Sequence, residues 1–146
     1  MKQLLVLILL LAGAGPMAAQ GLPQSRIEAL EKTYKMALFR GVDGDLFDME
    51  SDPAARGAQA YTNILGWLPG RVAGLQVYYY RGIPYPYIRG YLANLYLDEL
   101  RVDAATINSI PVSDIALVKV MKGPVVIAGG SPGGTIAIYT KRGEGE

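Results

Sequence analysis

The sequence contains neither cysteine nor histidine among its 146 residues. Without cysteine the chain cannot form disulfides or carry a lipid on an N-terminal cysteine. Without histidine it lacks the usual base of a serine triad, and without both it lacks the ordinary ligands of zinc and transition metals. The sequence therefore predicts a domain held together by packing alone, with no metal site and no bound cofactor.

An excess of charge of either sign is also missing. The formal net charge is +1 at pH 7, and removal of Lys2 brings it to about zero. A near-neutral chain exerts no long-range attraction on nucleic acid or on anionic lipid. Nucleic acid is therefore not an expected partner.

Residues 1–20 show the three regions of a secretory signal peptide. Lys2 gives a positive start, Leu4 to Leu11 form an unbroken apolar run, and small residues follow up to Ala18-Ala19-Gln20. The apolar run is shorter than the ~20 residues that a membrane-spanning helix needs. We therefore expect export, cleavage near Gln20, and no transmembrane span in the mature chain.

The remaining length suits one domain with a modest hydrophobic core. An outer-membrane barrel needs at least about eight strands of roughly ten residues each, and the sequence has no such series of segments. The expected organisation is a helical segment with an acidic linker at residues 21–60, a compact domain at residues 61–143, and a charged tail at residues 144–146.

Two helices are expected near the start of the mature chain. Ser25 and Glu28 have the spacing of a capping box, and apolar residues then recur at helical spacing, which predicts a helix from Arg26 to Arg40. Asp52 stands before a proline and predicts the N-cap of a second helix, from Pro53 to Leu68.

The acidic stretch between these helices, Gly41 to Asp52, has no apolar periodicity and is interpreted as a solvated loop. A calcium loop would need oxygen ligands at alternating positions, and Phe47 occupies one of those positions. No metal site is therefore predicted there.

Five short strands are expected in the second half, where β-branched and aromatic residues gather between glycine and proline turn signals. In the last strand Ile136 and Ile138 share one face, and the other face is also mostly apolar, which places this strand in the interior of the sheet. A sharp entry at Gly134 would use the positive φ that glycine can adopt. Asp103 predicts the cap of a helical turn over Ala104 to Ser109. The predicted strands are Leu75 to Tyr80, Tyr87 to Arg89, Leu95 to Asp98, Ile115 to Met121 and Thr135 to Thr140.

The closing segment resembles a known family almost residue for residue. An Asp-Ile strand, a Lys-Gly-Pro turn, a glycine-rich loop and a final Thr-Lys-Arg-Gly strand follow in the order found in the plug domain of TonB-dependent outer-membrane receptors, including those of Bacteroidetes type. Gly74-Leu75-Gln76-Val77 and Leu95-Tyr96-Leu97-Asp98 extend the resemblance over residues 61–143. The matching residues at the C-terminal end are Asp114, Ile115, Val118, Val120, Lys122, Gly123, Pro124, Gly134, Ile136, Ile138, Thr140, Lys141, Arg142 and Gly143.

The sequence departs from that family in three respects. Glu99 follows Asp98 where the family has glycine, so the tight hairpin turn expected there lacks its usual residue. The family's serine-rich loop is shortened to residues 91–94, and the chain has no convincing TonB box. The resemblance therefore does not imply energy coupling.

Ser131 matches the Gly-x-Ser-x-Gly expression of hydrolases, but a nucleophile elbow leads into a helix and this segment leads into a β-rich run. A dyad with Lys119, Lys122 or Lys141 is disfavoured because nothing in the pattern places a lysine in a desolvated site. A phosphate-binding loop would need a Gly-Lys pair before a helix, and both are missing. The glycines are interpreted as a close crossing of the backbone over the sheet, and no catalytic residue is predicted.

Tyrosine is the one aromatic residue in abundance. Seven of the ten tyrosines lie between Tyr78 and Tyr96, a density typical of protein interfaces and of surfaces that stack on carbohydrate. Alternation along a strand puts Tyr79 on the opposite face from its neighbours, so at least one ring should be exposed. Ordinary sheet packing remains the alternative. The candidate partner-binding surface consists of Tyr78, Tyr79, Tyr80, Arg81, Tyr85, Tyr87, Arg89 and Tyr91.

The expected fold class is α+β, with two N-terminal helices and a small mixed sheet. The resemblance implies a non-enzymatic plug domain without its own barrel, in the periplasm or at the outer membrane of a Gram-negative bacterium. It would act with an outer-membrane β-barrel or another envelope protein in substrate binding or gating. Two alternatives stay open: a free-standing periplasmic binding or adaptor module for a glycan, peptide or envelope protein, and a receptor fragment without a function of its own.

Overall fold

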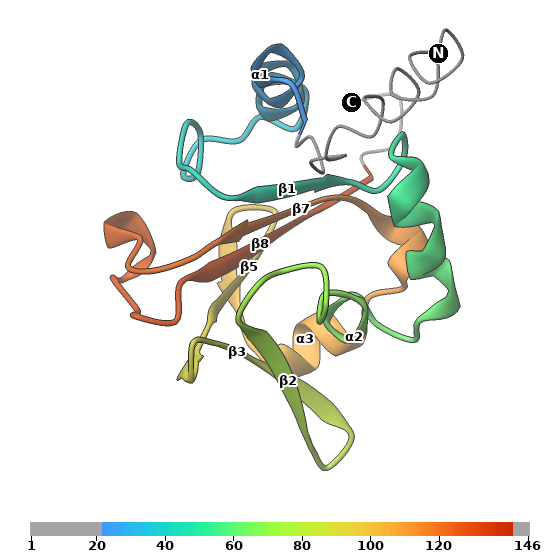
Figure 1. Cartoon of the computed structure of the whole chain (residues 1–146), viewed down its shortest axis with the longest axis vertical. Coiled ribbons are helices and arrows are strands. Elements are labelled where there is room, and N and C mark those ends of the chain that lie inside the picture. The colour runs from blue at the N-terminus through green and yellow to red at the C-terminus, as the bar shows by residue number, and fades with distance from the viewer. Residues whose placement is uncertain (1–21, 142–146) are drawn as a thin grey trace, which may run out of the picture.

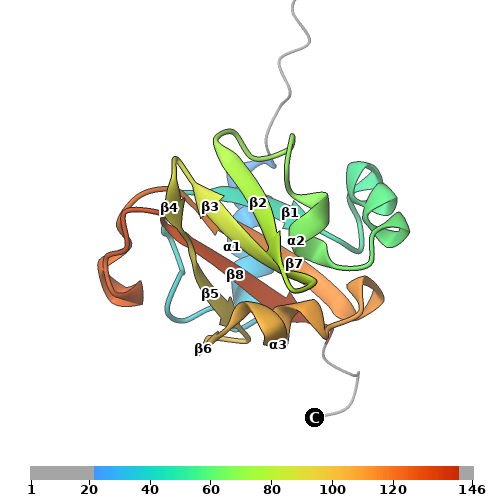
Figure 2. The same ribbon diagram turned by 90° about the horizontal axis from the view of Figure 1, so that it is seen from below.

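A computed structural model describes residues 22–141. The predicted signal peptide and charged tail lie outside the described residues. The chain forms the expected α+β fold in three layers, with α1 (Gln24–Thr33) on one face of a five-stranded sheet and a three-stranded sheet on the other (Figure 1). Seen from below, the smaller sheet lies in front of the large sheet and α1 behind it (Figure 2).

The large sheet has the strand order β1-β7-β8-β5-β6, in which only β5 and β8 are parallel. The last strand lies between β7 and β5, and Ile136, Ala137 and Ile138 are at most 1% exposed. Its predicted interior position is therefore confirmed. The strands of this sheet are β1 (Asp45–Asp48), β5 (Asn94–Leu97), β6 (Leu100–Val102), β7 (Ile115–Met121) and β8 (Thr135–Thr140).

The smaller sheet has the order β2-β3-β4, with strands Leu75–Tyr80, Ile83–Ile88 and Tyr91–Leu92. The second of the predicted strands, Tyr87 to Arg89, begins four residues earlier than expected, because Pro84 and Pro86 hide its start in the sequence. Arg89 N–H donates to Gly74 O, so the ladder alternation leaves both prolines at positions whose missing N–H points away from β2. The strand pairing therefore tolerates both rings.

Glycines let the loop before β8 pass close to neighbouring backbone, as predicted. Gly134 has φ +74, and a Cβ there would lie 2.1 Å from Met121 O. A Cβ on Gly133 would lie 2.5 Å from Tyr91 O. Side chains at these two positions would collide with backbone that cannot move independently.

The predicted first helix is wrong at both ends. It begins at Gln24 without a side-chain cap, so the expected capping box at Ser25 and Glu28 does not form. It ends at Thr33, and Lys35 then adopts φ +49. The helix is shorter because the following residues fold back over the sheet to bury Met36 and Phe39.

The acidic stretch from Gly41 to Asp52 was expected to be a solvated loop, and this expectation is wrong. Residues 45–48 form β1, which pairs antiparallel with β7. Asp48 is 2% exposed and accepts a hydrogen bond from the Arg26 guanidinium at 2.6 Å. The sequence pattern does not indicate this strand, because its two acidic residues become compatible with a strand only through cations elsewhere in the chain, Arg26 and Lys122.

The predicted second helix is broken. Asp52 does cap it, accepting from Ala54 N at 2.9 Å, but residues 53–60 form a 3-10 helix. Asn63 caps a separate short helix, α2 (Ile64–Trp67). Tyr61 lies between the two and is exposed. The Asp103 cap is confirmed, on α3 (Ala104–Asn108).

The α1 layer is fastened to the sheet by a buried ion pair. Lys119, on the central part of β7, is 2% exposed, and its Nζ lies 2.7 Å from Glu31 Oε1 and 2.8 Å from Phe39 O. The sequence was expected to place no lysine in a desolvated site, so this is a correction. Its cause is again a partner remote in sequence, since Glu31 lies 88 positions earlier.

The turn between β5 and β6 keeps a tight hairpin geometry despite its unusual residues. Asp98 and Glu99 both have positive φ, 47 and 73 degrees. Asp98 accepts from Thr140 N and Oγ1, while Glu99 accepts from Leu38 N and from the Tyr139 hydroxyl. These bonds hold the two residues in a conformation that would otherwise favour glycine.

Candidate partner-binding surface

The candidate surface is built on the hairpin of β2 and β3, which projects from the body of the molecule (Figure 1). Its turn is Arg81-Gly82, with φ of 51 and 78 degrees, which matches the tight turns that suit the twist of paired strands. Tyr78 lies opposite Tyr85 in the register, and Tyr80 lies opposite Ile83. Residues directly opposite share a face, so these side chains lie on the same side of the hairpin.

Four tyrosines share this face, which we call the outer face of the hairpin: Tyr78, Tyr80, Tyr85 and Tyr87. Tyr78 and Tyr87 are in edge contact, with ring centroids 5.4 Å apart, and the Tyr78 hydroxyl donates to Gln76 Oε1. Tyr78 and Tyr80 are 58% and 62% exposed, while Tyr85 and Tyr87 are half-buried. The outer face therefore has two half-buried rings and two rings that are exposed to solvent.

Tyr79 points to the other side of the hairpin, as alternation predicts, and it is also exposed. A Cβ on Gly66 would lie 3.0 Å from its hydroxyl, so the ring reaches over the start of α2. It helps to line a hollow of about 420 Å³ together with Tyr61, Asn63 and Asn108. Tyr79 thus belongs to a different site from the outer face.

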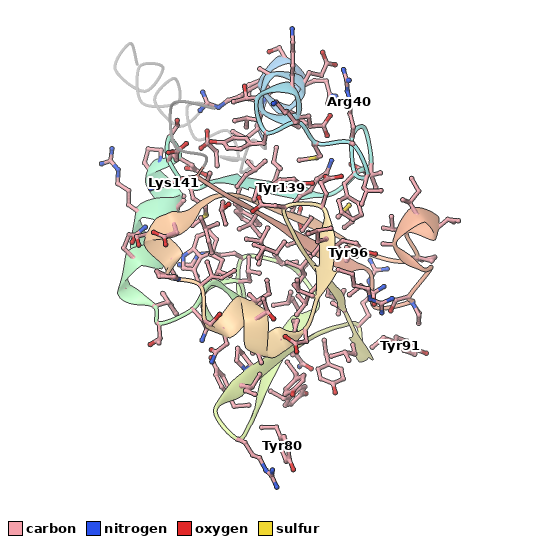
Figure 3. All side chains as sticks on the ribbon, turned by 180° about the vertical axis from the view of Figure 1, so that it is seen from behind. Arg40, Tyr80, Tyr91, Tyr96, Tyr139 and Lys141 are labelled. Carbon is pink, nitrogen blue, oxygen red and sulfur yellow. The ribbon has the colours of Figure 1, made fainter. Side chains whose placement is uncertain are left out.

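Tyr91 is also separate from the outer face. It lies in β4 opposite Ile88, whose side chain is fully buried on the core side. Figure 3 shows Tyr80 at the end of the projecting hairpin and Tyr91 well away from it on the flank. The eight predicted residues therefore do not form a single patch.

The two arginines of the predicted set are the first residues of tight turns at the margins of the small sheet, Arg81-Gly82 and Arg89-Gly90. The Arg81 guanidinium lies 5.3 Å from the centre of the Tyr80 ring, a cation–π distance. Arg89 is exposed and lies beside Gly74. Among residues 22–141, neither arginine takes part in an ion pair. The hairpin consequently presents uncompensated positive charge beside its rings.

One member of this surface was missed by sequence reasoning. Leu92 lies opposite Tyr87 in β4 and is exposed, so it adds apolar area next to the outer face. A strand of two residues has no periodic signal, and nothing in the sequence indicated its register.

Ser131 is engaged in a structural role. Its hydroxyl donates to Leu92 O at 3.1 Å and accepts from Gly133 N at 3.3 Å. The loop leads into β8 without a helix. Lys119 bonds Glu31, and Lys122 bonds Asp45, so neither lysine serves Ser131.

Four side chains have pKa values shifted from their ordinary values: Tyr34, Asp48, Asp103 and Tyr139. Burial raises the pKa of Asp48, but hydrogen bonds from Arg26 and from the backbone outweigh it and leave the pKa below its ordinary value. Burial and the neighbouring Glu99 raise the pKa of Tyr139, and burial and Glu50 raise that of Tyr34. Hydrogen bonds from Thr106 lower the pKa of the exposed Asp103 carboxyl. The hydrogen bonds of these groups lie within the fold.

Two further features of the described part of the chain bear on function. Within residues 22–141, no cluster of three acidic, histidine or cysteine side chains is placed to hold a metal ion. No helix in the same range is long and apolar enough to cross a membrane.

Neither a protein-family model nor a curated protein matches the sequence. Solved structures do resemble the fold, among them an uptake receptor and a peptide importer. The ferric yersiniabactin uptake receptor FyuA from Yersinia pestis matches over 70% of this chain and 17% of its own, with 19% identity and a TM-score of 0.51. The RagAB peptide importer in its open-open state matches over 72% of this chain and 13% of its own, with 20% identity and a TM-score of 0.50. The chain therefore has a plug-like fold, similar to the plug region of TonB-dependent receptors.

Proposed function

We propose that this protein is a non-enzymatic plug module of an outer-membrane uptake system, exported to the envelope of a Gram-negative bacterium. It works with a separate partner, an outer-membrane β-barrel or another envelope protein, in substrate binding or gating. The support is the plug-like fold, which occupies only 17% and 13% of the two similar uptake proteins. A partner would supply what the remaining length supplies in those proteins.

The observation that carries the proposal is the projecting hairpin with its exposed rings. Tyr78 and Tyr80 are each about 60% exposed although they lie in a strand, and Arg81 has no carboxylate partner among the described residues. Exposed tyrosine and arginine close together are the residues that most often dominate protein interfaces. The outer face is accordingly the surface that meets the partner or the substrate.

The test is capture of partners from an envelope extract by the tagged mature chain, with cross-linking and identification by mass spectrometry. We expect an outer-membrane β-barrel to be recovered, and the double variant Tyr78→Ser/Tyr80→Ser to bind it roughly tenfold more weakly or worse. Tyr61→Ser is the matched control, because Tyr61 is an exposed ring away from the outer face. Equal capture by all three proteins would contradict the role of the outer face.

The free-standing binding module is the second candidate, and the open rings of Tyr78 and Tyr80 favour it because aromatic faces also stack on sugars. In that case a glycan array or a periplasmic peptide mixture should bind the purified chain, and no barrel should be recovered. A receptor fragment without function would bind nothing in either assay. The mass of the protein from the envelope fraction tests export, since cleavage near Gln20 should remove the leader.

A further inference from the structure

The strand β1 has one edge that no other strand covers. It is the terminal strand of the large sheet, paired with β7 alone. Met49 N–H donates to Ala116 O, so the antiparallel alternation gives the β7 bonds to residues 45, 47 and 49. The N–H and C=O of Leu46 therefore point to the uncovered edge.

A groove runs along that edge. It has a volume of about 750 Å³ and is open to solvent. The start of α1 forms one wall through Leu22, Pro23 and Ile27. The opposite wall contains Pro53 and Arg71, from segments on the other face of the sheet. An added strand would lie between these walls and continue the sheet beyond β1.

Arg71 is the one cation of the groove lining without an ion-pair partner among residues 22–141. Of the acidic residues in the lining, Asp48 pairs with Arg26 and Asp45 with Lys122, while Asp52 forms no ion pair and accepts a hydrogen bond from Ala54 N. Arg71 is exposed, with its guanidinium 4.5 Å from the centre of the Trp67 ring and one hydrogen bond to Trp67 O. No carboxylate within residues 22–141 pairs with it. The groove therefore complements a ligand that carries a negative charge near Arg71.

We propose that this groove binds an extended peptide segment, which adds to the sheet as a strand next to β1 and places a carboxylate against Arg71. An extended backbone presents a donor and an acceptor at the spacing of the outward Leu46 C=O and N–H. Its alternate side chains face the apolar wall of α1 on one side and Phe47 with Pro53 on the other. This site is separate from the outer face of the hairpin, and it requires no barrel.

The probe is a library of random heptapeptides displayed on phage, selected on the immobilised full mature chain. The enriched sequence is synthesised with a fluorescent label, and its affinity is measured by polarisation. Three forms of it are compared: the parent peptide, a form N-methylated at the residue facing Leu46, and a form whose carboxylate is replaced by an amide. We expect the N-methylated form to bind about tenfold more weakly or worse, because it lacks a main-chain donor.

Leu46→Pro removes the outward N–H of β1 and leaves the ladder to β7 intact, because proline is tolerated at such edge positions. Leu46→Ala is the matched control, which loses the side chain and keeps the N–H. We expect about a tenfold loss of affinity in Leu46→Pro beyond the loss in Leu46→Ala. Arg71→Gln should weaken the parent peptide to the level of its amide form, and the amide form should bind wild type and Arg71→Gln equally.

Hydrogen exchange on the wild-type protein gives a readout that depends on no variant. The bound peptide should slow exchange of the Leu46 amide about tenfold or more, because it closes the only open edge of β1. Failure to enrich any peptide, or an unprotected Leu46 amide in the complex, would overturn the proposal. Self-association of the wild type that Leu46→Pro abolishes, without peptide binding, would assign the edge to a second copy and equally overturn it. Loss of the tyrosine-dependent capture alone would leave this inference standing.

Discussion

The strongest prediction concerns the buried pair of Lys119 and Glu31. The two side chains are 2% and 4% exposed, and their charged atoms lie 2.7 Å apart. Removal of one partner leaves the other charge buried and unpaired, which typically costs 3–5 kcal/mol. In Lys119→Met the uncompensated charge is the Glu31 carboxylate, which still accepts from Gly41 N. Since a domain of this size is stable by about 5–15 kcal/mol, we expect a loss of roughly a fifth of the total or more.

The double variant Glu31→Leu/Lys119→Met provides the decisive comparison. It removes both charges and keeps apolar volume, a replacement that is often neutral or stabilising. The assay is urea unfolding of the mature chain, followed by the fluorescence of Trp67, which is the only tryptophan. The double variant should recover most of the free energy of unfolding lost in Lys119→Met. A cost below about 1 kcal/mol in Lys119→Met would show that the pair is hydrated, and the reasoning from burial would be wrong.

Three further predictions follow from the sheet and from the α1 layer. Gly134→Ala should cost about 1–3 kcal/mol more than Gly123→Ala in thermal melts, because both have positive φ but only Gly134 meets backbone; equal costs would contradict this. Ile136→Asp should unfold the chain by circular dichroism, because a fully buried carboxylate would be unpaired, and a folded product would refute the interior position of β8. The Asp48 pKa is lowered by folding, so its contribution to stability is present above its unfolded pKa of about 3.9 and is lost as the pH falls through the lower folded value. Unfolding midpoints below pH 5 should therefore fall less steeply in Asp48→Asn, and parallel profiles would exclude this role.

Strands rich in β-branched, apolar and aromatic residues could be predicted from the sequence to the residue. β2, β7 and β8 begin and end where expected, because runs such as Ile115–Met121 and Thr135–Thr140 admit no other element. β1 could not be predicted, since its Asp-Leu-Phe-Asp sequence becomes compatible with burial only through Arg26 and Lys122. The same distinction holds for the helix boundaries. The start of α3 could be predicted because Asp103 caps it through a local hydrogen bond, whereas the end of α1 could not, because it depends on tertiary contacts.

The candidate surface could be predicted in composition but not in shape. The density of tyrosines and the alternation of the strand give the opposite orientation of Tyr79 correctly. The division into an outer face, a hollow at Tyr79 and a flank at Tyr91 depends on how the small sheet sits on the large one. The groove at β1 could not be anticipated at all, because the strand that forms its floor was itself missed.

The position of β8 has a consequence for the way the chain is made. The strand at the centre of the large sheet is the last one in the sequence, and it joins β5 to β7, which do not pair with each other. Lys119, the buried anchor of α1, also belongs to the last third of the chain. As the chain is synthesised from its N-terminus, α1 and β5 must wait for strands that arrive last. The domain is therefore expected to close in one late step, and to stay open to proteases and chaperones until residue 140 has emerged.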